Sequence, residues 1–408
     1  MSLRFICIEL RKNLRCANVF LQFDQSLTET EFLKIKVDND AIRLKEYSTE
    51  TCAQVQQHFT IEARSMSNLI VEECNASFRI TIEELSVDDN IEVEASMSSN
   101  KIVTNLKPKV RTSEVVIINC TNCKAALTQS QQFERVLEFP SDSIDMGEFF
   151  CHHGPDFGEV LVPQKHDLFF GFQFLVLNAE LMRENTKEKD KHLYCRRCLR
   201  YLGETLFNSK AAKVWSDNVV LQKPNDCGTE LQEVFEETLL TPTCQLLHKI
   251  IREFNTSPDN NELLQQFQFS KVLLEAVFPN RQRRYLLLHI LEKQLEVLRN
   301  TRPLAHGSIH NNNNALQVDL KTFKCFKLMY RLIDEENRTQ KCDCDGQKAD
   351  APLLAVWKQD ISIYVMKISP TLFSDLLSEL DENSLLLPEL YRFSNDDFQL
   401  SYDIKNIF

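Results

Sequence analysis

The chain has 408 residues, enough for two or three domains with their own hydrophobic cores. Its 47 lysines and arginines are outnumbered by 59 aspartates and glutamates, and the formal net charge of -12 argues against a general phosphate-binding surface. No apolar run approaches the roughly 20 residues that a bilayer requires. We therefore expect a protein with no direct nucleic-acid contact and no membrane partner.

The 14 cysteines stand in paired and in isolated positions. Charged residues break the first apolar stretch early, so we expect no secretory signal, a reducing compartment and a cytoplasmic location, with the nucleus as a second one. The isolated cysteines are then predicted to be small buried hydrophobes; they are Cys7, Cys16, Cys52, Cys74, Cys227, Cys244 and Cys325.

We predict an α+β fold in three regions, the first of which is an N-terminal β-rich domain over 1–109. Short β-branched segments with alternating polarity, such as 77–82 and 90–94, are typical of strands. Clusters of Asp, Asn and Ser between them indicate turns, so an antiparallel sheet or a sandwich is expected. A boundary loop is predicted over 96–109.

The second region, 110–222, is predicted to be a central β-region held together by a bound zinc ion. The continuous apolar run 168–177 predicts one buried strand, and the charged stretch 184–191 predicts an exposed loop. Two Cys-x-x-Cys pairs, with 71 residues between them, mark this region. They bring together segments that are distant in the sequence.

The two pairs predict a structural metal site. Two thiolates on a tight turn can bind one metal, and a second pair completes a closed tetrahedral shell, for which zinc is the expected cofactor. A redox pair is the alternative, but it needs a strand-to-helix setting and no second motif. The predicted ligands are Cys120, Cys123, Cys195 and Cys198.

A further motif, Cys151-His152-His153, lies between the two pairs. It could supplement the zinc shell, although two pairs already fill a tetrahedron. Cys151 could also be an inert cysteine of the hydrophobic core, although two neighbouring histidines argue against a core that excludes water. A catalytic Cys-His pair is the third interpretation, although neighbours on a strand point to opposite faces.

The third region, 223–408, is predicted to combine strands with a few amphipathic helices. Thr241-Pro242 is typical of an N-cap followed by a proline in the first turn, which predicts a helix over 242–254. The remaining predictions are strands within 267–297, a loop over 306–314, a loop over 341–350 with a weak Cys342/Cys344 metal site, a strand over 361–368 and a helix over 370–380.

Four blocks of the sequence form a known combination: Cys120-Thr-Asn-Cys123, Glu148-Phe-Phe-Cys151-His152, Cys195-Arg-Arg-Cys198-Leu-Arg-Tyr-Leu-Gly203-Glu204-Thr205 and Trp357-Lys-Gln-Asp360-Ile361-Ser362. Together they resemble the HECT-like, ubiquitin-conjugating-enzyme-binding family of ubiquitin-protein ligases. The resemblance covers most of the chain from about 115 onward, and the third block is its most specific part.

This resemblance implies binding to a ubiquitin-conjugating enzyme, a HECT-like C-terminal stretch with ligase activity, and involvement with the endonuclease of pre-mRNA 3'-end cleavage. HECT chemistry needs a cysteine nucleophile, because ubiquitin passes from one thioester to another. Leu372 stands in the place of that nucleophile, and no cysteine follows Cys344. No catalytic residue is therefore predicted, and the resemblance to transferases leaves enzymatic activity undecided.

The Cys151 block also resembles a motif of a nuclease assembly factor, in which a cysteine enters the two-metal site of a metallo-β-lactamase-type endonuclease. That resemblance implies that Cys151 and His152 ligate the metal of a partner nuclease, since an open catalytic metal accepts a thiolate where water would bind. We thus expect a protein that binds a ubiquitin-conjugating enzyme and masks and stabilises the 3'-end-processing endonuclease. The alternatives are an active ubiquitin-protein ligase and a purely structural adaptor.

Overall fold

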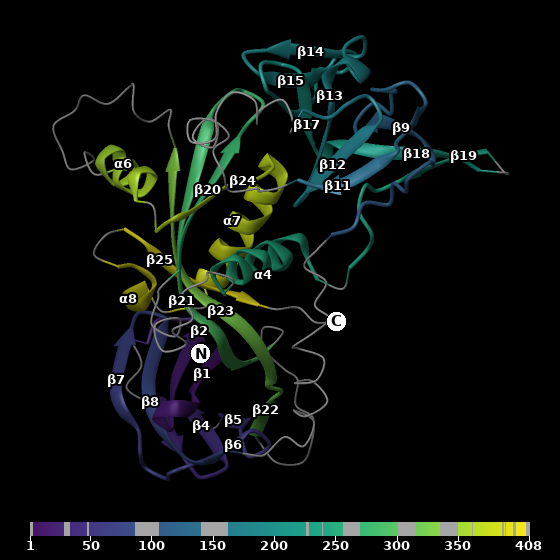
Figure 1. Cartoon of the computed structure of the whole chain (residues 1–408). Helices are drawn as coiled ribbons and strands as arrows, with labels where there is room; N and C mark the ends of the chain where they lie inside the picture. The colour runs from purple at the N-terminus through teal and green to yellow at the C-terminus, as the bar shows by residue number, and fades with distance from the viewer. Residues whose placement is uncertain are drawn as a thin grey trace.

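The computed structural model describes residues 3–27, 33–46, 49–85, 106–139, 162–225, 228–238, 240–255, 270–300, 315–334, 350–360, 362–385, 387, 389–394 and 397–404. Strands dominate, and a small number of helices pack on them, so the chain is an α+β protein of the β-rich kind (Figure 1). Within the described ranges, no helix is long and apolar enough to cross a membrane.

The largest sheet has ten strands and contains both ends of the described chain. Its strands are β1 (Leu3–Arg11), β2 (Cys16–Phe23), β6 (Phe59–Ile61), β7 (Ser67–Glu72), β8 (Asn75–Leu85), β20 (Ser270–Val277), β21 (Arg283–Arg299), β23 (Lys321–Asp334), β24 (Tyr364–Lys367) and β25 (Gln399–Ile404). The order is β24-β20-β21-β1-β2-β8-β6, while β7 pairs with β8, β23 with β21, and β25 with β23. The strands predicted within 267–297 are confirmed as β20 and β21.

The long strand β21 connects the N-terminal strands to the C-terminal ones. Its first half pairs with β20, and its second half pairs with β1, where Cys7 lies opposite Arg299. The predicted regions 1–109 and 223–408 therefore share one sheet. The boundaries between the three regions stay a prediction, and the predicted strand 90–94 lies outside the described residues.

A small sheet lies against the N-terminal end of the large one. It consists of β3 (Leu33–Val37), β4 (Ala41–Glu46), β5 (Thr49–Gln54) and β22 (Ala315–Val318), in the order β22-β5-β4-β3. Ile8 and Val19 of the large sheet and Ile42 and Leu44 of the small one belong to one buried cluster. The antiparallel pairing of β1, β2 and β8 confirms the antiparallel sheet predicted for this region.

Two further sheets form the central region. One holds β9 (Val115–Cys120), β10 (Gln131–Gln132), β18 (Val219–Asn225) and β19 (Gly228–Gln232), in the order β10-β9-β18-β19. The other holds β11 (Arg135–Glu138), β12 (Asp167–Gly171), β13 (Phe174–Asn178), β14 (Thr186–Lys189), β15 (His192–Cys195), β16 (Tyr201–Leu206) and β17 (Ala211–Trp215), in the order β11-β12-β13-β17-β16-β15-β14. The central region is thus β-structure, as predicted.

Two predictions for this region are wrong in detail. The apolar run 168–177 forms the hairpin of β12 and β13, with a two-residue turn in which Gln173 has φ 61°. Both strands are buried on both faces, so the apolar pattern continues through the turn and does not mark it. The stretch 184–191 contains β14, whose charged residues are exposed because it is an edge strand.

The helices cover the large sheet, and α4 (Pro242–Asn255) and α7 (Pro370–Ser384) lie side by side on it (Figure 1). The Thr241 hydroxyl accepts from the Cys244 N–H, which confirms the N-cap predicted for α4. The Ser369 hydroxyl accepts from the Leu372 N–H and caps α7 in the same way. The other helices are α6 (Asp350–Gln359), α8 (Glu389–Arg392), η1 (Lys12–Leu14), η2 (Ala179–Leu181) and η3 (Ser216–Asn218).

A buried charge network joins the first strand of the large sheet to its last. The carboxylate of Glu9 on β1 is fully buried and receives hydrogen bonds from Tyr402 of β25 and, at 2.7 Å, from Lys327 of β23. Arg11 and Asn18 donate to its other oxygen at 3.2 Å each. Burial by itself would raise the pKa of Glu9, but the Lys327 charge and these hydrogen bonds lower it below its usual value.

Glu9→Gln should destabilise the fold by about 3–5 kcal/mol at neutral pH, because it leaves the Lys327 charge buried without a carboxylate. Since the pKa of Glu9 is lower in the folded state, its stabilising effect is present above the unfolded-state pKa and is lost as the pH falls through the folded-state pKa. Urea denaturation from pH 7 to pH 3 should show a flatter pH dependence for Glu9→Gln than for wild type. Glu296→Gln, which removes a more exposed ion pair with Lys12, is the control, and equal losses for both variants would refute the assignment.

Candidate metal centre

The candidate metal centre is formed by two cysteine turns that come from different sheets. The first turn, 120–123, follows β9 of the four-stranded sheet, and the second turn, 195–198, connects β15 to β16 of the seven-stranded sheet. The two pairs that the sequence predicts to share a metal are therefore brought together by the packing of the two sheets.

The two turns have the same backbone hydrogen bonds at equivalent positions. In the first, the Lys124 N–H donates to the Cys120 carbonyl and the Cys120 N–H donates to the Ala125 carbonyl, both at 2.9 Å. In the second, Leu199 and Cys195 repeat this pattern at the same distances, with Arg200 in the place of Ala125. Lys124 and Leu199 have positive φ angles, 56° and 58°, which turn the chain back.

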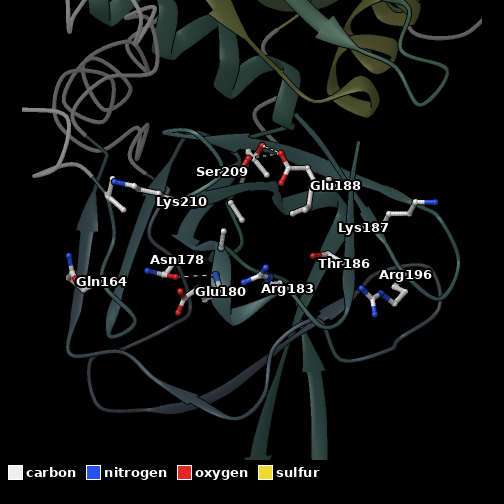
Figure 2. Close-up of a pocket in the computed structure, with 15 residues that line it drawn as sticks. Gln164, Asn178, Glu180, Arg183, Thr186, Lys187, Glu188, Arg196, Ser209 and Lys210 are labelled. Carbon is white, nitrogen blue, oxygen red and sulfur yellow. Dashed lines mark hydrogen bonds between the residues drawn. The ribbon is translucent and has the colours of Figure 1, made fainter. Parts of the chain in front are cut away.

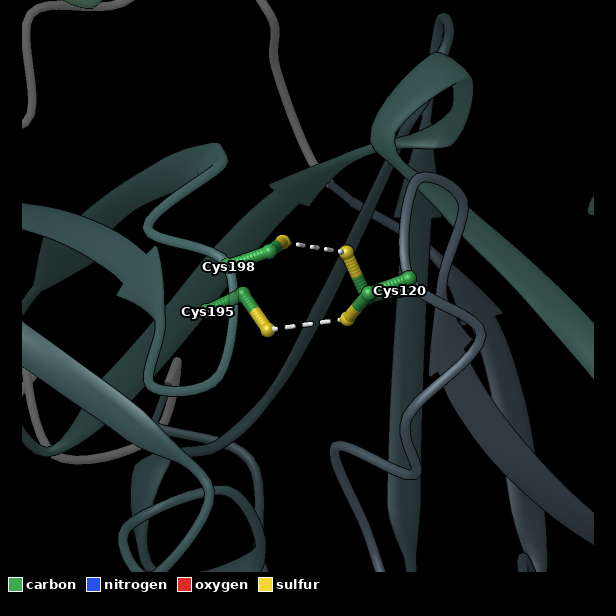
Figure 3. Close-up of side chains that lie close together, drawn as sticks. Cys120, Cys195 and Cys198 are labelled. Atoms are coloured by element: carbon green, nitrogen blue, oxygen red, sulfur yellow. Dashed lines mark hydrogen bonds between the residues drawn. The ribbon is translucent and has the colours of Figure 1, made fainter.

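The four thiols face one another across the gap between the turns (Figure 3). The Sγ atoms of Cys120 and Cys198 are 3.7 Å apart, and those of Cys123 and Cys195 are 3.6 Å apart. A disulfide needs about 2.05 Å. A tetrahedron with metal–sulfur bonds of about 2.3 Å has edges of about 3.8 Å, so the cluster has the size of a four-thiolate metal shell.

The protein environment gives three of the thiols unequal acidity. Burial raises the pKa of Cys120 to about 12 and raises that of Cys195 as well. For Cys198 burial acts in the same direction, but hydrogen bonds from the Asn122 side chain, the Arg200 backbone and neighbouring thiols lower its pKa to about 6. Cys198 is thus the most acidic of these three thiols, and a bound cation would stabilise the thiolate form of the cysteines that hold it.

Gly203, in the most specific block of the resemblance, has a structural role next to this cluster. It lies on β16 between Leu193 of β15 and Val214 of β17. A Cβ atom at this position would lie 2.0 Å from the carbonyl oxygen of Lys213, and the φ angle of 159° is also unfavourable for other residues. The glycine allows the strand that follows the second cysteine turn to approach its neighbour.

Four of the other predicted ligands, Cys151, His152, Cys342 and Cys344, lie outside the described residues. Leu372, at the position of a HECT nucleophile, is buried in the main core. The structure therefore places no nucleophile there.

Most of the isolated cysteines are buried, as predicted: Cys7, Cys16, Cys52, Cys244 and Cys325. Cys74 is partly exposed, so the prediction is wrong for this residue, and Cys227 lies outside the described part of the chain. The positive φ angles of Lys124 and Leu199 were not predicted from the sequence. Both residues directly follow the second cysteine of a pair, and this shared position could have identified them as turn residues.

Comparison with known proteins places the chain in a family. The chain is similar to an E3 ubiquitin-protein ligase of Rattus norvegicus, with 24% identity over 314 residues, 74% of each chain. It is similar to the E3 ubiquitin-protein ligase of the same name from Mus musculus, with 23% identity over 316 residues, 75% of each chain. No solved structure matches it. A family model described as HECT-like ubiquitin-conjugating enzyme (E2)-binding matches residues 9–400, nearly the whole chain, and the protein therefore belongs to this family.

Proposed function

We propose that this protein binds a ubiquitin-conjugating enzyme as a scaffold and does not itself carry ubiquitin as a thioester. The match of residues 9–400 to an E2-binding family is the observation that carries this proposal. The absence of a thiol at Leu372 supports the second part of it, because thioester transfer requires an accessible thiolate. The relatives that it resembles are named ubiquitin-protein ligases, which favours ubiquitin transfer promoted by scaffolding as the alternative activity.

The described cysteines support a role without a thioester. Cys325 is fully buried, and its thiol donates to the Leu295 carbonyl at 3.5 Å. Cys7 is buried as well, and burial raises its pKa to about 12. Outside the four-cysteine cluster, Cys74 is the most accessible thiol in the described ranges, and it lies in the turn between β7 and β8.

Incubation with a charged ubiquitin-conjugating enzyme should therefore give no ubiquitin adduct that a reducing agent removes. Non-reducing gel electrophoresis with labelled ubiquitin measures this directly. A ubiquitin-conjugating enzyme with its own thioester is the positive control for detection. An adduct that disappears on Cys325→Ser, Cys342→Ser or Cys344→Ser would contradict the proposal and establish a thioester-forming ligase.

The metal in the four-cysteine cluster is proposed to be zinc with a structural role. Four thiolates fill a tetrahedral shell and leave no open position for water or substrate, which is the arrangement of structural zinc sites. The residues that would hold it are Cys120, Cys123, Cys195 and Cys198. Zinc would supply folding energy at the contact between the two central sheets.

A second part of the proposed function is the binding of a partner nuclease. Cys151 and His152 would ligate the metal of the metallo-β-lactamase-type endonuclease of pre-mRNA 3'-end cleavage, and so mask and stabilise that enzyme in the cytoplasm and the nucleus. Support comes from the four-cysteine cluster, which is complete without Cys151. Neither cysteine turn needs it as a ligand, so this thiol is available for another role.

Cys151→Ser should weaken capture of such a nuclease at least about tenfold, because a neutral hydroxyl is a much poorer zinc ligand than a thiolate. Quantitative mass spectrometry of pull-downs from cells measures the change. Metal content and melting temperature should match wild type. Cys74→Ser is the matched control and should keep full capture; loss of the protein's own metal in Cys151→Ser would assign Cys151 to the scaffold instead.

A further inference from the structure

A pocket of about 930 Å³ opens on the seven-stranded sheet, beside the second cysteine turn (Figure 2). Its size is that of a ligand-binding pocket, for which about 300–1,000 Å³ is usual. Buried residues of four neighbouring strands contribute to its lining, among them Thr186, Leu193, Thr205 and Ala212. The second cysteine turn contributes Arg196. We call it the basic pocket.

Positively charged side chains outnumber negative ones in the lining of the basic pocket. Arg183, Lys187, Arg196 and Lys210 line it together with two carboxylates, Glu180 and Glu188, in a chain whose net charge is -12. Arg183 and Arg196 are exposed, and neither forms an ion pair with any residue that the structure describes. An excess of cations over anions around a hollow attracts negatively charged groups.

The two carboxylates of the lining already have partners. Glu180 forms an ion pair with Lys165 at 2.8 Å. Oε1 of Glu188 accepts hydrogen bonds from Thr205 at 2.9 Å and from Ser209 at 2.6 Å (Figure 2). Its second oxygen, Oε2, has no such partner among the described residues. The pocket thus combines arginine and lysine donors with one fixed, available acceptor.

We propose that the basic pocket binds a short acidic segment of a partner protein. The planar guanidinium groups of Arg183 and Arg196 suit side-chain carboxylates, which they can bind through two parallel hydrogen bonds. The available oxygen of Glu188 suits a backbone N–H of the same segment. A peptide supplies both groups, and this proposal does not depend on the proposed E2-binding and Cys151 functions.

A nucleic acid fits the basic pocket less well. No aromatic side chain lines it on which a base could stack, and Glu180 and Glu188 would repel phosphates. The cations are confined to one hollow and do not follow an extended groove, as backbone recognition requires. The lining therefore favours a short carboxylate-rich peptide.

Arg196 links the basic pocket to the candidate metal centre. It follows the ligand Cys195 directly, and its N–H donates to the Asn185 carbonyl at 2.9 Å. The position of its guanidinium group therefore depends on the fold of the second cysteine turn. Removal of the metal is expected to weaken peptide binding as well.

Fluorescence anisotropy of the full-length protein with a fluorescein-labelled peptide of six glutamates tests the proposal. The peptide should bind, binding should weaken as salt is raised, and a six-glutamine peptide should bind at least about tenfold more weakly. Arg183→Ala and Arg196→Ala should each weaken binding about tenfold, since each removes a charge-assisted hydrogen bond.

Lys34→Ala is the matched control, because Lys34 is an exposed lysine on β3 of the small sheet. It should leave the affinity unchanged. Equal binding of the glutamine peptide, or equal affinity of Arg183→Ala, Arg196→Ala and Lys34→Ala, would overturn the proposal. Tighter binding of labelled hexauridylate than of the glutamate peptide would also overturn it and assign the pocket to RNA.

Discussion

Cys195→Ala should remove the bound metal and the cooperative unfolding of the two central sheets. Cys195 ends β15, and its sulfur lies 3.6 Å from that of Cys123, so the substitution opens the shell at the contact between the two turns. Structural zinc contributes on the order of 10 kcal/mol to the folding of small domains, which is comparable with the whole stability of a typical domain, about 5–15 kcal/mol. The loss should therefore unfold this region at 37 °C.

Elemental analysis of the purified protein should give about one zinc ion per chain for wild type and none for Cys195→Ala. Thermal unfolding followed by circular dichroism should lose its sharp transition in the variant and in wild type treated with a chelator. Cys244→Ala is the control, because Cys244 is fully buried on α4 and is not one of the four clustered cysteines. It should keep the metal. A Cys195→Ala protein that retains both zinc and its transition would contradict the four-cysteine assignment.

Gly203→Ala is expected to have the second largest effect, a loss of at least about 3 kcal/mol in the free energy of unfolding. The added methyl group would lie 2.0 Å from the Lys213 carbonyl oxygen, a backbone atom that cannot move without breaking the pairing of β16 with β17. Because β16 lies inside the seven-stranded sheet, neither neighbour can separate freely. Urea denaturation should show a lower midpoint with the same slope.

Glu204→Ala, at the next position, tests whether this effect is specific. Glu204 is half-buried, and its carboxylate lies 4.0 Å from Lys213 and 3.8 Å from Lys367. Long ion pairs of this kind contribute about 0–1 kcal/mol, so its removal should cost little. Equal losses for Gly203→Ala and Glu204→Ala would show that the close backbone approach has no special role.

The sequence alone was sufficient where the determining interactions are local. The helix at 242–254 follows from a threonine cap, a proline in the first turn and apolar residues at helical spacing, and α4 begins at Pro242 as expected. The helix predicted over 370–380 is α7, which begins at Pro370. The four-cysteine cluster was predicted from spacing, because each pair belongs to one turn that its own backbone closes.

The tertiary structure decided what depends on contacts between distant residues. Apolar patterning predicts that a segment is buried but not its partner, so neither the turn between β12 and β13 nor the pairing of β1 with β21 was predicted. The basic pocket also depends on contacts between residues that are distant in the sequence. Arg183, Glu188 and Arg196 are ordinary charged residues in the sequence, and only the packing of the strands around β15 places them about one hollow.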